Sequence, residues 1–392
     1  MADLPDNRHN DLPSLLPSLL RRHQRIIGPA GGAAGVVIGI YSDTARQALD
    51  WLWTHLLTPY TLAAAQFVVI AVASWTLRGW VERRRQGRRQ IVSRSFDIRL
   101  CDFEDDLTGD QTVIGRKLRY LERRTESKTL VVMLPGLGLD ANDFRPYMNI
   151  AREHTVAVTL FGFNQSEAKD ERYRPVSLAT HVELVNWALG NLRRQYQHKR
   201  MVLVGFSIGA DMIMRLGEFW QDHPGRNPDI HAMLLMDPNI NRSSMVVSGA
   251  LAGMDPADPL AELKKVSQTA TNLTEFQNIC EYLHKISKKD LAQIQRHAKD
   301  WWEYWEEAGR YDRFMQRIGR LYAHCPRIQV LFSAHYDGSF NEIVARARQH
   351  GMSHIFDSYG IDHFEFLNEQ FLAQKISAVT AAPARPPELA RR

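Results

Sequence analysis

Short hydrophobic runs recur along the chain, and most of them do not alternate with polar residues. Unbroken apolar runs of this length are typical of strands that are buried on both faces of a sheet. Two earlier segments, residues 95–103 and 117–124, are rich in β-forming residues and predict an opening antiparallel pair. The buried strands are expected at 129–134, 155–161, 201–206, 232–237 and 328–334, and a last strand at 353–359.

Longer stretches between these runs have the length and composition of helices, for example residues 177–196 and 208–220. Alternating strands and helices predict an α/β fold with a mainly parallel sheet and helices on both faces. Residues 241–326 are different, because they are polar, helical in composition and contain three tryptophans. We expect them to form a helical cap, inserted between a first core part (93–240) and a second core part (327–378).

The N-terminal arm contains a run of 27 residues without a formal charge, residues 51–77. A helix that crosses a bilayer needs about 20 mainly apolar residues, and Pro59 to Leu77 supplies 19. Tryptophans stand near both ends of the run, as expected at membrane interfaces. The run therefore predicts a transmembrane helix, and a buried core helix is the alternative.

A second uncharged stretch, residues 26–42, is shorter and rich in glycine. Together the two stretches predict a membrane anchor at 26–77, with either one helix or a hairpin. The alternative for the first stretch is a loop before an interfacial helix at 43–57. The linker at 78–92 holds six arginines, which marks the cytoplasmic side of a membrane, expected to be a bacterial inner membrane. Residues 1–25 and 379–392 have the composition of disordered tails.

The charge of the chain is concentrated in this arm. Residues 1–90 hold 11 Arg, no Lys and 6 acidic residues, so the rest of the 392-residue chain carries 38 basic and 38 acidic residues. A neutral body argues against a nucleic-acid partner. The three cysteines, Cys101, Cys280 and Cys325, are far apart, which disfavours a cysteine-ligated metal site.

The sharpest motif is a GxSxG sequence from Gly205 to Gly209, with Ser207 at its centre. A predicted strand precedes it and a predicted helix follows it, which is the context that a nucleophile elbow requires. The glycines permit a sharp turn that exposes the serine hydroxyl above the sheet. We therefore expect Ser207 to be a nucleophile.

A serine nucleophile needs a base, and the base needs an acid that fixes its tautomer. His363 follows the last predicted strand and is the candidate base. Asp337 follows the strand at 328–334 and is the first candidate for the acid, and the order Ser207, Asp337, His363 fits this architecture. Asp237, at the end of the strand at 232–237, is the alternative acid.

An oxyanion hole is expected where LPGLG (134–138) follows a predicted strand. The backbone amides of Leu137 and Ile208 are the natural pair of donors. The sequence contains no HExxH motif, no phosphate-binding loop and no dinucleotide-binding fingerprint. It therefore predicts neither a metal nor a cofactor.

With these motifs in this order, residues 93–378 resemble an α/β-hydrolase-fold serine hydrolase, of the esterase, lipase and thioesterase kind. The resemblance implies the fold and the catalytic type but not the substrate. One departure is Pro135, which stands where the family often has a histidine.

The function expected from these features is that of a membrane-tethered serine hydrolase, which cleaves a carboxylic ester or thioester. The tether favours a lipid or acyl substrate. Two alternatives remain open at this point: acyl transfer to an acceptor other than water, and a pseudo-enzyme that binds an acyl ligand or a partner protein.

Overall fold

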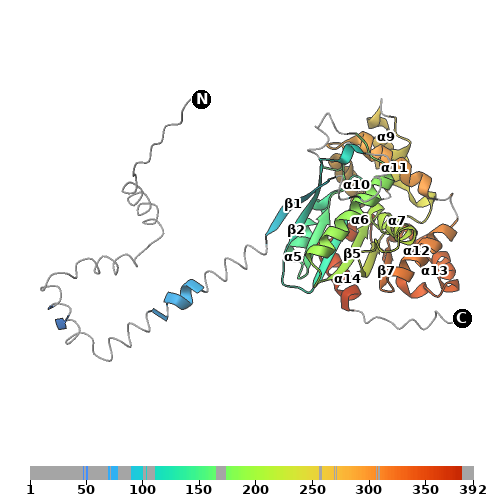
Figure 1. Cartoon of the computed structure of the whole chain (residues 1–392). Helices are drawn as coiled ribbons and strands as arrows, with labels where there is room; N and C mark the ends of the chain where they lie inside the picture. The colour runs from blue at the N-terminus through green and yellow to red at the C-terminus, as the bar shows by residue number, and fades with distance from the viewer. Residues whose placement is uncertain are drawn as a thin grey trace, which may run out of the picture. The chain divides into compact units, whose positions relative to one another are not determined.

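The computed structural model describes most of the chain from residue 90 onward and scattered helical residues before it (Figure 1). The chain divides into two compact units, residues 1–84 and 85–392. The predicted tail at 1–25, residues 382–392 of the tail predicted at 379–392, and most of the predicted anchor and linker lie outside the described residues. Residues 379–381 of the predicted tail instead form the end of the helix α14 (Glu369–Ala381). Within the described residues, no helix has both the length and the apolar character needed to cross a membrane. The described residues are 47, 50–51, 69–70, 72–77, 90–99, 103, 111–164, 174–255, 258–268, 270, 272–305, 307 and 310–381.

An eight-stranded sheet forms the centre of the second unit, in the order β1-β2-β4-β3-β5-β6-β7-β8. The strand β2 pairs antiparallel with both β1 and β4, and all the other neighbours pair parallel. The predicted opening antiparallel pair is thus confirmed, although β1 begins at residue 91 rather than 95. The strands are β1 (Ile91–Asp97), β2 (Lys117–Arg123), β3 (Thr129–Leu134), β4 (His154–Val158), β5 (Arg200–Phe206), β6 (Ile230–Met236), β7 (Ile328–Phe332) and β8 (Phe356–Ser358).

The unbroken apolar runs form the strands at the centre of this sheet, as predicted. Every residue of β3 and β4 is buried, and so are six of the seven residues of β5. Burial of both faces removes the apolar side chains from water. This stabilises the folded state by about 25 cal/mol for each Å² of apolar surface that is buried. This explains why the sequence of these strands does not alternate.

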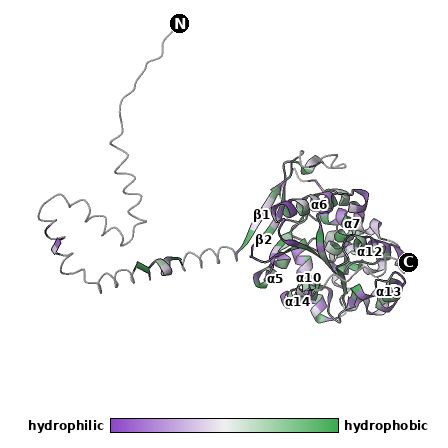
Figure 2. Ribbon diagram, turned by 60° about the horizontal axis from the view of Figure 1, so that its bottom comes forward, coloured by the Kyte–Doolittle hydropathy of each residue, from purple (hydrophilic) through white to green (hydrophobic). Residues whose placement is uncertain are grey.

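Helices cover the sheet in two groups. In the first group, α5 packs against α14, and α14 also contacts β6. In the second group, α7 packs against β5, α6 and α12. Figure 2 shows that these helices carry both hydrophilic and hydrophobic positions, as expected for helices with one face against a core. The helices of the core are α5 (Arg145–Ile150), α6 (Leu178–Gln195), α7 (Ile208–Asp222), α12 (Asp312–His324), α13 (Asp337–Gln349) and α14 (Glu369–Ala381).

The segment between β6 and β7 is helical, as the sequence predicts. It contains α8 (Val246–Ala252), α9 (Pro259–Ser267), α10 (Leu273–Ile286) and α11 (Leu291–Tyr304). These four helices pack as a chain of neighbours, α11 on α8, α8 on α9 and α9 on α10, and α9, α10 and α11 gather at one end of the sheet (Figure 1). We call α8–α11 the cap. The fifth helix of the segment, α12, packs against α7 and belongs to the core layer.

Candidate active site

The loop between β5 and α7 is a sharp turn around Ser207. Ser207 has φ 53° and ψ −124°, a conformation that a residue other than glycine rarely adopts. Both neighbouring glycines are required for steric reasons. A Cβ at Gly205 would lie 2.4 Å from the Gly209 carbonyl oxygen, and one at Gly209 would lie 2.1 Å from the Leu134 carbonyl oxygen. The turn therefore holds a half-buried serine at the carboxyl end of β5.

The second component is Asp237, which follows the last residue of β6, the strand next to β5. It is buried and also has a positive φ, of 51°. Its Oδ1 accepts a hydrogen bond from the Ser333 amide (2.7 Å), and its Oδ2 accepts one from the Ser333 hydroxyl (2.9 Å). Because Ser333 follows β7 directly, the carboxylate is held between the ends of two adjacent strands.

His363 completes the group from the far end of the chain. It is the first residue of the 3-10 helix η8 (His363–Leu367), which follows β8. Its Nδ1 lies 2.5 Å from the Oδ2 of Asp237. Its ring packs against the ring of Phe206, with 4.7 Å between the centroids, and Phe206 immediately precedes Ser207. A carboxylate can only accept, so Nδ1 carries the proton and Nε2 is left as the basic nitrogen.

The pairing expected between Asp337 and His363 is corrected by this geometry, since His363 pairs with Asp237, the alternative acid. The strand β7 ends at Phe332, and the chain then makes a 3-10 turn, η6 (Ala334–Tyr336), before it reaches Asp337. Asp337 is consequently exposed at the start of α13, where its Oδ1 accepts a hydrogen bond from the Ser358 hydroxyl at 3.3 Å.

The two candidate oxyanion donors, the amides of Ile208 and Leu137, belong to two loops that reach Ser207. Ile208 is the first residue of α7, where a backbone amide has no acceptor within the helix. The loop after β3 also comes close to Ser207, since a Cβ at Gly136 would lie 3.3 Å from the Cβ of Ser207. Leu137 follows Gly136 in that loop. The structure thus brings the loops of both donors to Ser207.

The cap covers this group through α10. The Asn278 side chain donates a hydrogen bond to the Oδ2 of Asp362 at 2.8 Å, next to His363. The ring of Tyr282 packs against the ring of Phe364, on the other side of His363, with 5.5 Å between the centroids. The loop that carries the histidine is therefore fixed by the cap as well as by the core.

The sequence analysis missed a buried carboxylate near this site. Asp211, in the first turn of α7, is fully buried and accepts hydrogen bonds from the Asn239 amide (2.9 Å), the Asn239 side chain (2.6 Å) and the indole of Trp305 (3.1 Å). Burial raises the pKa of Asp211 to about 7, and the three hydrogen bonds oppose that rise. A charged residue four positions after Ser207, in the otherwise apolar first two turns of the helix (208–214), is the pattern that would have identified it.

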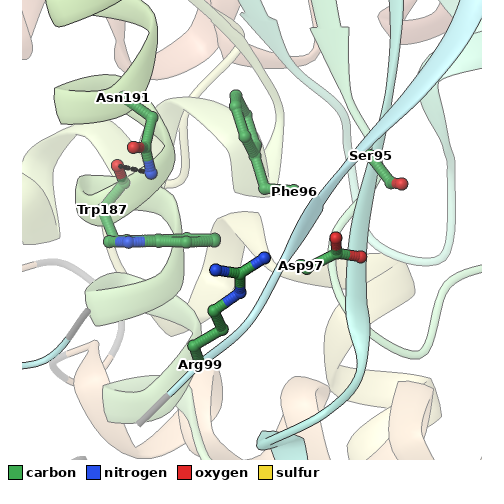
Figure 3. A pocket seen from close by; sticks show the side chains of 6 residues that line it. All are labelled: Ser95, Phe96, Asp97, Arg99, Trp187 and Asn191. Carbon is green, nitrogen blue, oxygen red and sulfur yellow. Dashed lines mark hydrogen bonds between the residues drawn. The ribbon is translucent and has the colours of Figure 1, made fainter. Parts of the chain in front are cut away.

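Among the described residues, no group of three or more His, Cys, Asp or Glu side chains is arranged to hold a metal ion. A hollow of about 240 Å³ lies elsewhere, between β1 and α6, and shares no residue with the group around Ser207 (Figure 3). Its lining residues are Ser95, Phe96, Asp97, Arg99, Trp187 and Asn191.

Comparison with known proteins gives the fold. No family model matches the sequence, and no curated protein matches it. Among solved structures, 1H-3-hydroxy-4-oxoquinoline 2,4-dioxygenase is similar, with a TM-score of 0.52 and 13% identity over 73% of this chain and 99% of that one. The enzyme AqdC, described as cleaving the ring of the Pseudomonas quinolone signal, is similar with a TM-score of 0.52 and 17% identity over 68% of this chain and 97% of that one. A membrane phospholipase A described as a bacterial virulence factor is similar with a TM-score of 0.46 and 16% identity over 83% of this chain and 99% of that one.

The two structures with a TM-score of 0.52 are similar to this chain in fold. The body of this chain has the α/β-hydrolase fold.

Proposed function

We propose that the protein is a serine hydrolase that cleaves a carboxylic ester or thioester through an acyl-enzyme. The observation that carries the proposal is the 2.5 Å pairing of His363 with Asp237, beside a strained Ser207 on the neighbouring strand end. Two of the structures with this fold are described as a dioxygenase and a ring-cleaving enzyme. The fold alone therefore does not select a reaction, and the proposal rests on the side-chain geometry.

The first half of the reaction forms the acyl-enzyme. The Oγ of Ser207 attacks the carbonyl carbon of the substrate, and Nε2 of His363 takes its proton. The carboxylate of Asp237 stabilises the resulting imidazolium and keeps the proton on Nδ1. The amides of Leu137 and Ile208 bind the oxyanion. The carbon–oxygen or carbon–sulfur bond to the leaving group then breaks, and His363 protonates the alcohol or thiol.

The second half releases the acid. Water attacks the acyl carbon while His363 takes a proton from it, and the oxyanion forms again between the same two amides. The bond to Ser207 breaks, and the proton returns to its Oγ. An acceptor other than water would convert the same intermediate into the product of an acyl transfer.

Hydrolysis is tested with a panel of p-nitrophenyl esters, phospholipids and acyl-CoA thioesters. The full chain should hydrolyse at least one class, and Ser207→Ala should reduce the rate to that of the buffer. A product analysis in the presence of alcohols separates transfer from hydrolysis. A chain that binds acyl ligands but turns over none of them would instead support the pseudo-enzyme.

Tethering of this body to a membrane is a further part of the proposal, and it rests on the uncharged run at 51–77 and the arginines that follow. Most of the described side chains of that run are apolar, and the large ones are exposed, for example Val69 (67%) and Trp75 (77%). An apolar helix with exposed side chains needs a cover, and a bilayer supplies one. The arginines favour the cytoplasmic side. This location favours a lipid or acyl substrate.

Fractionation tests the tether. The full chain should sediment with membranes and stay there after a carbonate wash, whereas a chain without residues 1–90 should not. Recovery of the full chain in the supernatant without detergent would contradict the tether and leave the proposal on catalysis intact.

A further inference from the structure

The oxyanion loop is a β-turn from Gly136 to Leu139. The Leu139 amide closes it with a hydrogen bond to the Gly136 carbonyl at 3.1 Å. Gly138 has φ +69°, and Leu137 has no positive φ. A positive φ at the third residue alone defines a type II turn, which differs from type I in the orientation of the central peptide. The peptide between Leu137 and Gly138 is therefore the part of the loop whose orientation has to be fixed.

Two side chains from the cap region hold that peptide and the next one. The Tyr282 hydroxyl, on α10, donates to the Leu137 carbonyl at 3.0 Å. The ammonium of Lys289, three residues beyond α10, donates to the Gly138 carbonyl at 2.6 Å and to the Oδ2 of Asp140 at 2.8 Å. Both Tyr282 and Lys289 are buried. All three carbonyls from Gly136 to Gly138 are thus hydrogen-bonded, two of them to side chains from the cap region.

The cap also closes on the turn by packing. A Cβ on Gly138 would lie 2.7 Å from the Cγ2 of Ile286 and 3.2 Å from the Cδ1 of Ile294. The glycine is required both by its positive φ and by this close approach. The turn therefore has no room to move toward the cap, and its hydrogen bonds hold it there.

The Lys289 ammonium faces the carboxylate of Asp140, with 2.8 Å between its Nζ and the Oδ2 of Asp140. Burial alone raises the pKa of Asp140, but the Lys289 ammonium and the hydrogen bonds from Asn142 outweigh it and hold that pKa below its usual value. The contact between Lys289 and Asp140 is therefore an ion pair inside the folded protein. The ion pair fixes Asp140, the residue after the turn, to Lys289, which also donates to the turn.

We propose that Tyr282 and Lys289 are positioning residues, which hold the turn so that the Leu137 amide meets the oxyanion. The inference rests on the proposed ester hydrolysis. Without the Tyr282 hydroxyl, the buried Leu137 carbonyl loses its donor and the turn relaxes. An oxyanion donor works only at about 2.7–3.1 Å, and a misplacement of about 1 Å can cost about 100-fold in rate.

The test compares Tyr282→Phe with Tyr304→Phe in the full chain. Tyr304 is a second, partly buried tyrosine of the cap, and its buried hydroxyl has no hydrogen-bond partner among the described residues. With p-nitrophenyl acetate, Tyr282→Phe should lower kcat about 10- to 100-fold with a nearly unchanged KM. Tyr304→Phe should leave both constants unchanged.

A thionoester supplies the readout that general damage to the structure would not change. Sulfur is larger than oxygen and a poorer hydrogen-bond acceptor, so an intact oxyanion hole prefers p-nitrophenyl acetate over its thiono analogue. Tyr282→Phe should reduce this preference, whereas a general loss of structure lowers both rates equally. Lys289→Met should do the same more strongly, because it removes two hydrogen bonds, and Lys289→Arg should restore part of the rate.

Suppose that the wild type hydrolyses esters. The inference would then be overturned if Tyr282→Phe has the same kcat as the wild type and the same preference for p-nitrophenyl acetate over its thiono analogue. A wild type that neither hydrolyses esters nor forms a fluorophosphonate adduct would instead overturn the proposed function, and the inference with it. Melting temperatures of all variants identify any that fail to fold. If Tyr282→Phe does not fold, equal kcat values for Lys289→Met, Lys289→Arg and the wild type overturn the inference.

Discussion

Replacing Asp237 with asparagine should lower kcat by up to about 10⁴, because the amide forces His363 into the wrong tautomer. In the native site the Oδ1 of Asp237 accepts from the Ser333 amide, and the Oδ2 accepts from the Ser333 hydroxyl and from Nδ1 of His363. Asparagine offers only one oxygen, so one of these two positions must become an NH₂ donor.

The contact with Ser333 decides which position that is. A backbone amide cannot accept a hydrogen bond, so the oxygen of the asparagine has to face the Ser333 amide. The NH₂ group then donates to Nδ1 of His363, which moves the ring proton to Nε2 and removes the base. The reversed rotamer of the asparagine would turn its NH₂ group toward the Ser333 amide and leave that buried donor without an acceptor, which costs about 1–3 kcal/mol. Loss of the carboxylate charge beside the imidazolium adds to this, and a 10⁴-fold effect corresponds to about 5.4 kcal/mol.

Steady-state hydrolysis of p-nitrophenyl acetate at pH 8 measures the effect, with Asp337→Asn as the matched control. Asp337 is exposed and bonded to Ser358, so its variant should keep kcat within about threefold of the wild type, as for most surface substitutions. Thermal unfolding shows whether both variants fold. Full activity in Asp237→Asn together with a large loss in Asp337→Asn would refute the reasoning and return the acid role to Asp337.

Two further predictions concern stability. Burial raises the pKa of Asp211 from 3.8, its ordinary value in an unfolded chain, to about 7 in the folded protein, so the folded state binds the extra proton between these values. At 1.36 kcal/mol for each pKa unit, this proton uptake by Asp211 contributes about 4 kcal/mol to the free energy of unfolding. The contribution is fully present below pH 4 and is lost as the pH rises to 7. Urea unfolding at pH 5, 6, 7 and 8 should show this decline in the wild type relative to Asp211→Asn, and parallel curves would contradict it. Gly209→Ala should destabilise the protein by about 1–3 kcal/mol or more and abolish esterase activity, because its Cβ meets the Leu134 carbonyl at 2.1 Å. Gly338→Ala, in α13 with nothing within 4 Å of its Cβ, should be neutral or stabilising by up to about 1 kcal/mol, and equal effects of the two substitutions would contradict the steric argument.

The sequence was sufficient to predict the sheet and the elbow, because their causes are local. Unbroken apolar runs form the central strands since both faces are buried. The turn around Ser207 follows from two glycines whose replacement by any larger residue brings a Cβ against backbone atoms. Each of these features depends on a few consecutive residues, and its pattern is visible in them.

The acid and the cap contacts depend on distant residues. Asp237 and Asp337 both follow a predicted strand, and only the 3-10 turn after β7 moves Asp337 away from His363. Tyr282 meets Leu137 across 145 positions of the sequence, through the packing of α10 on the core. Nothing in the sequence near Tyr282 or Lys289 indicates that contact, because it is a property of the folded surface of the cap.

The most direct test of the central claim is the mass of the full chain after reaction with a fluorophosphonate. We expect one covalent adduct, located by peptide mapping on Ser207, that forms in the wild type, slows strongly in Asp237→Asn and is absent in Ser207→Ala. An adduct on another residue, or a Ser207→Ala variant that still reacts at the wild-type rate, would contradict the assignment of Ser207 as the nucleophile.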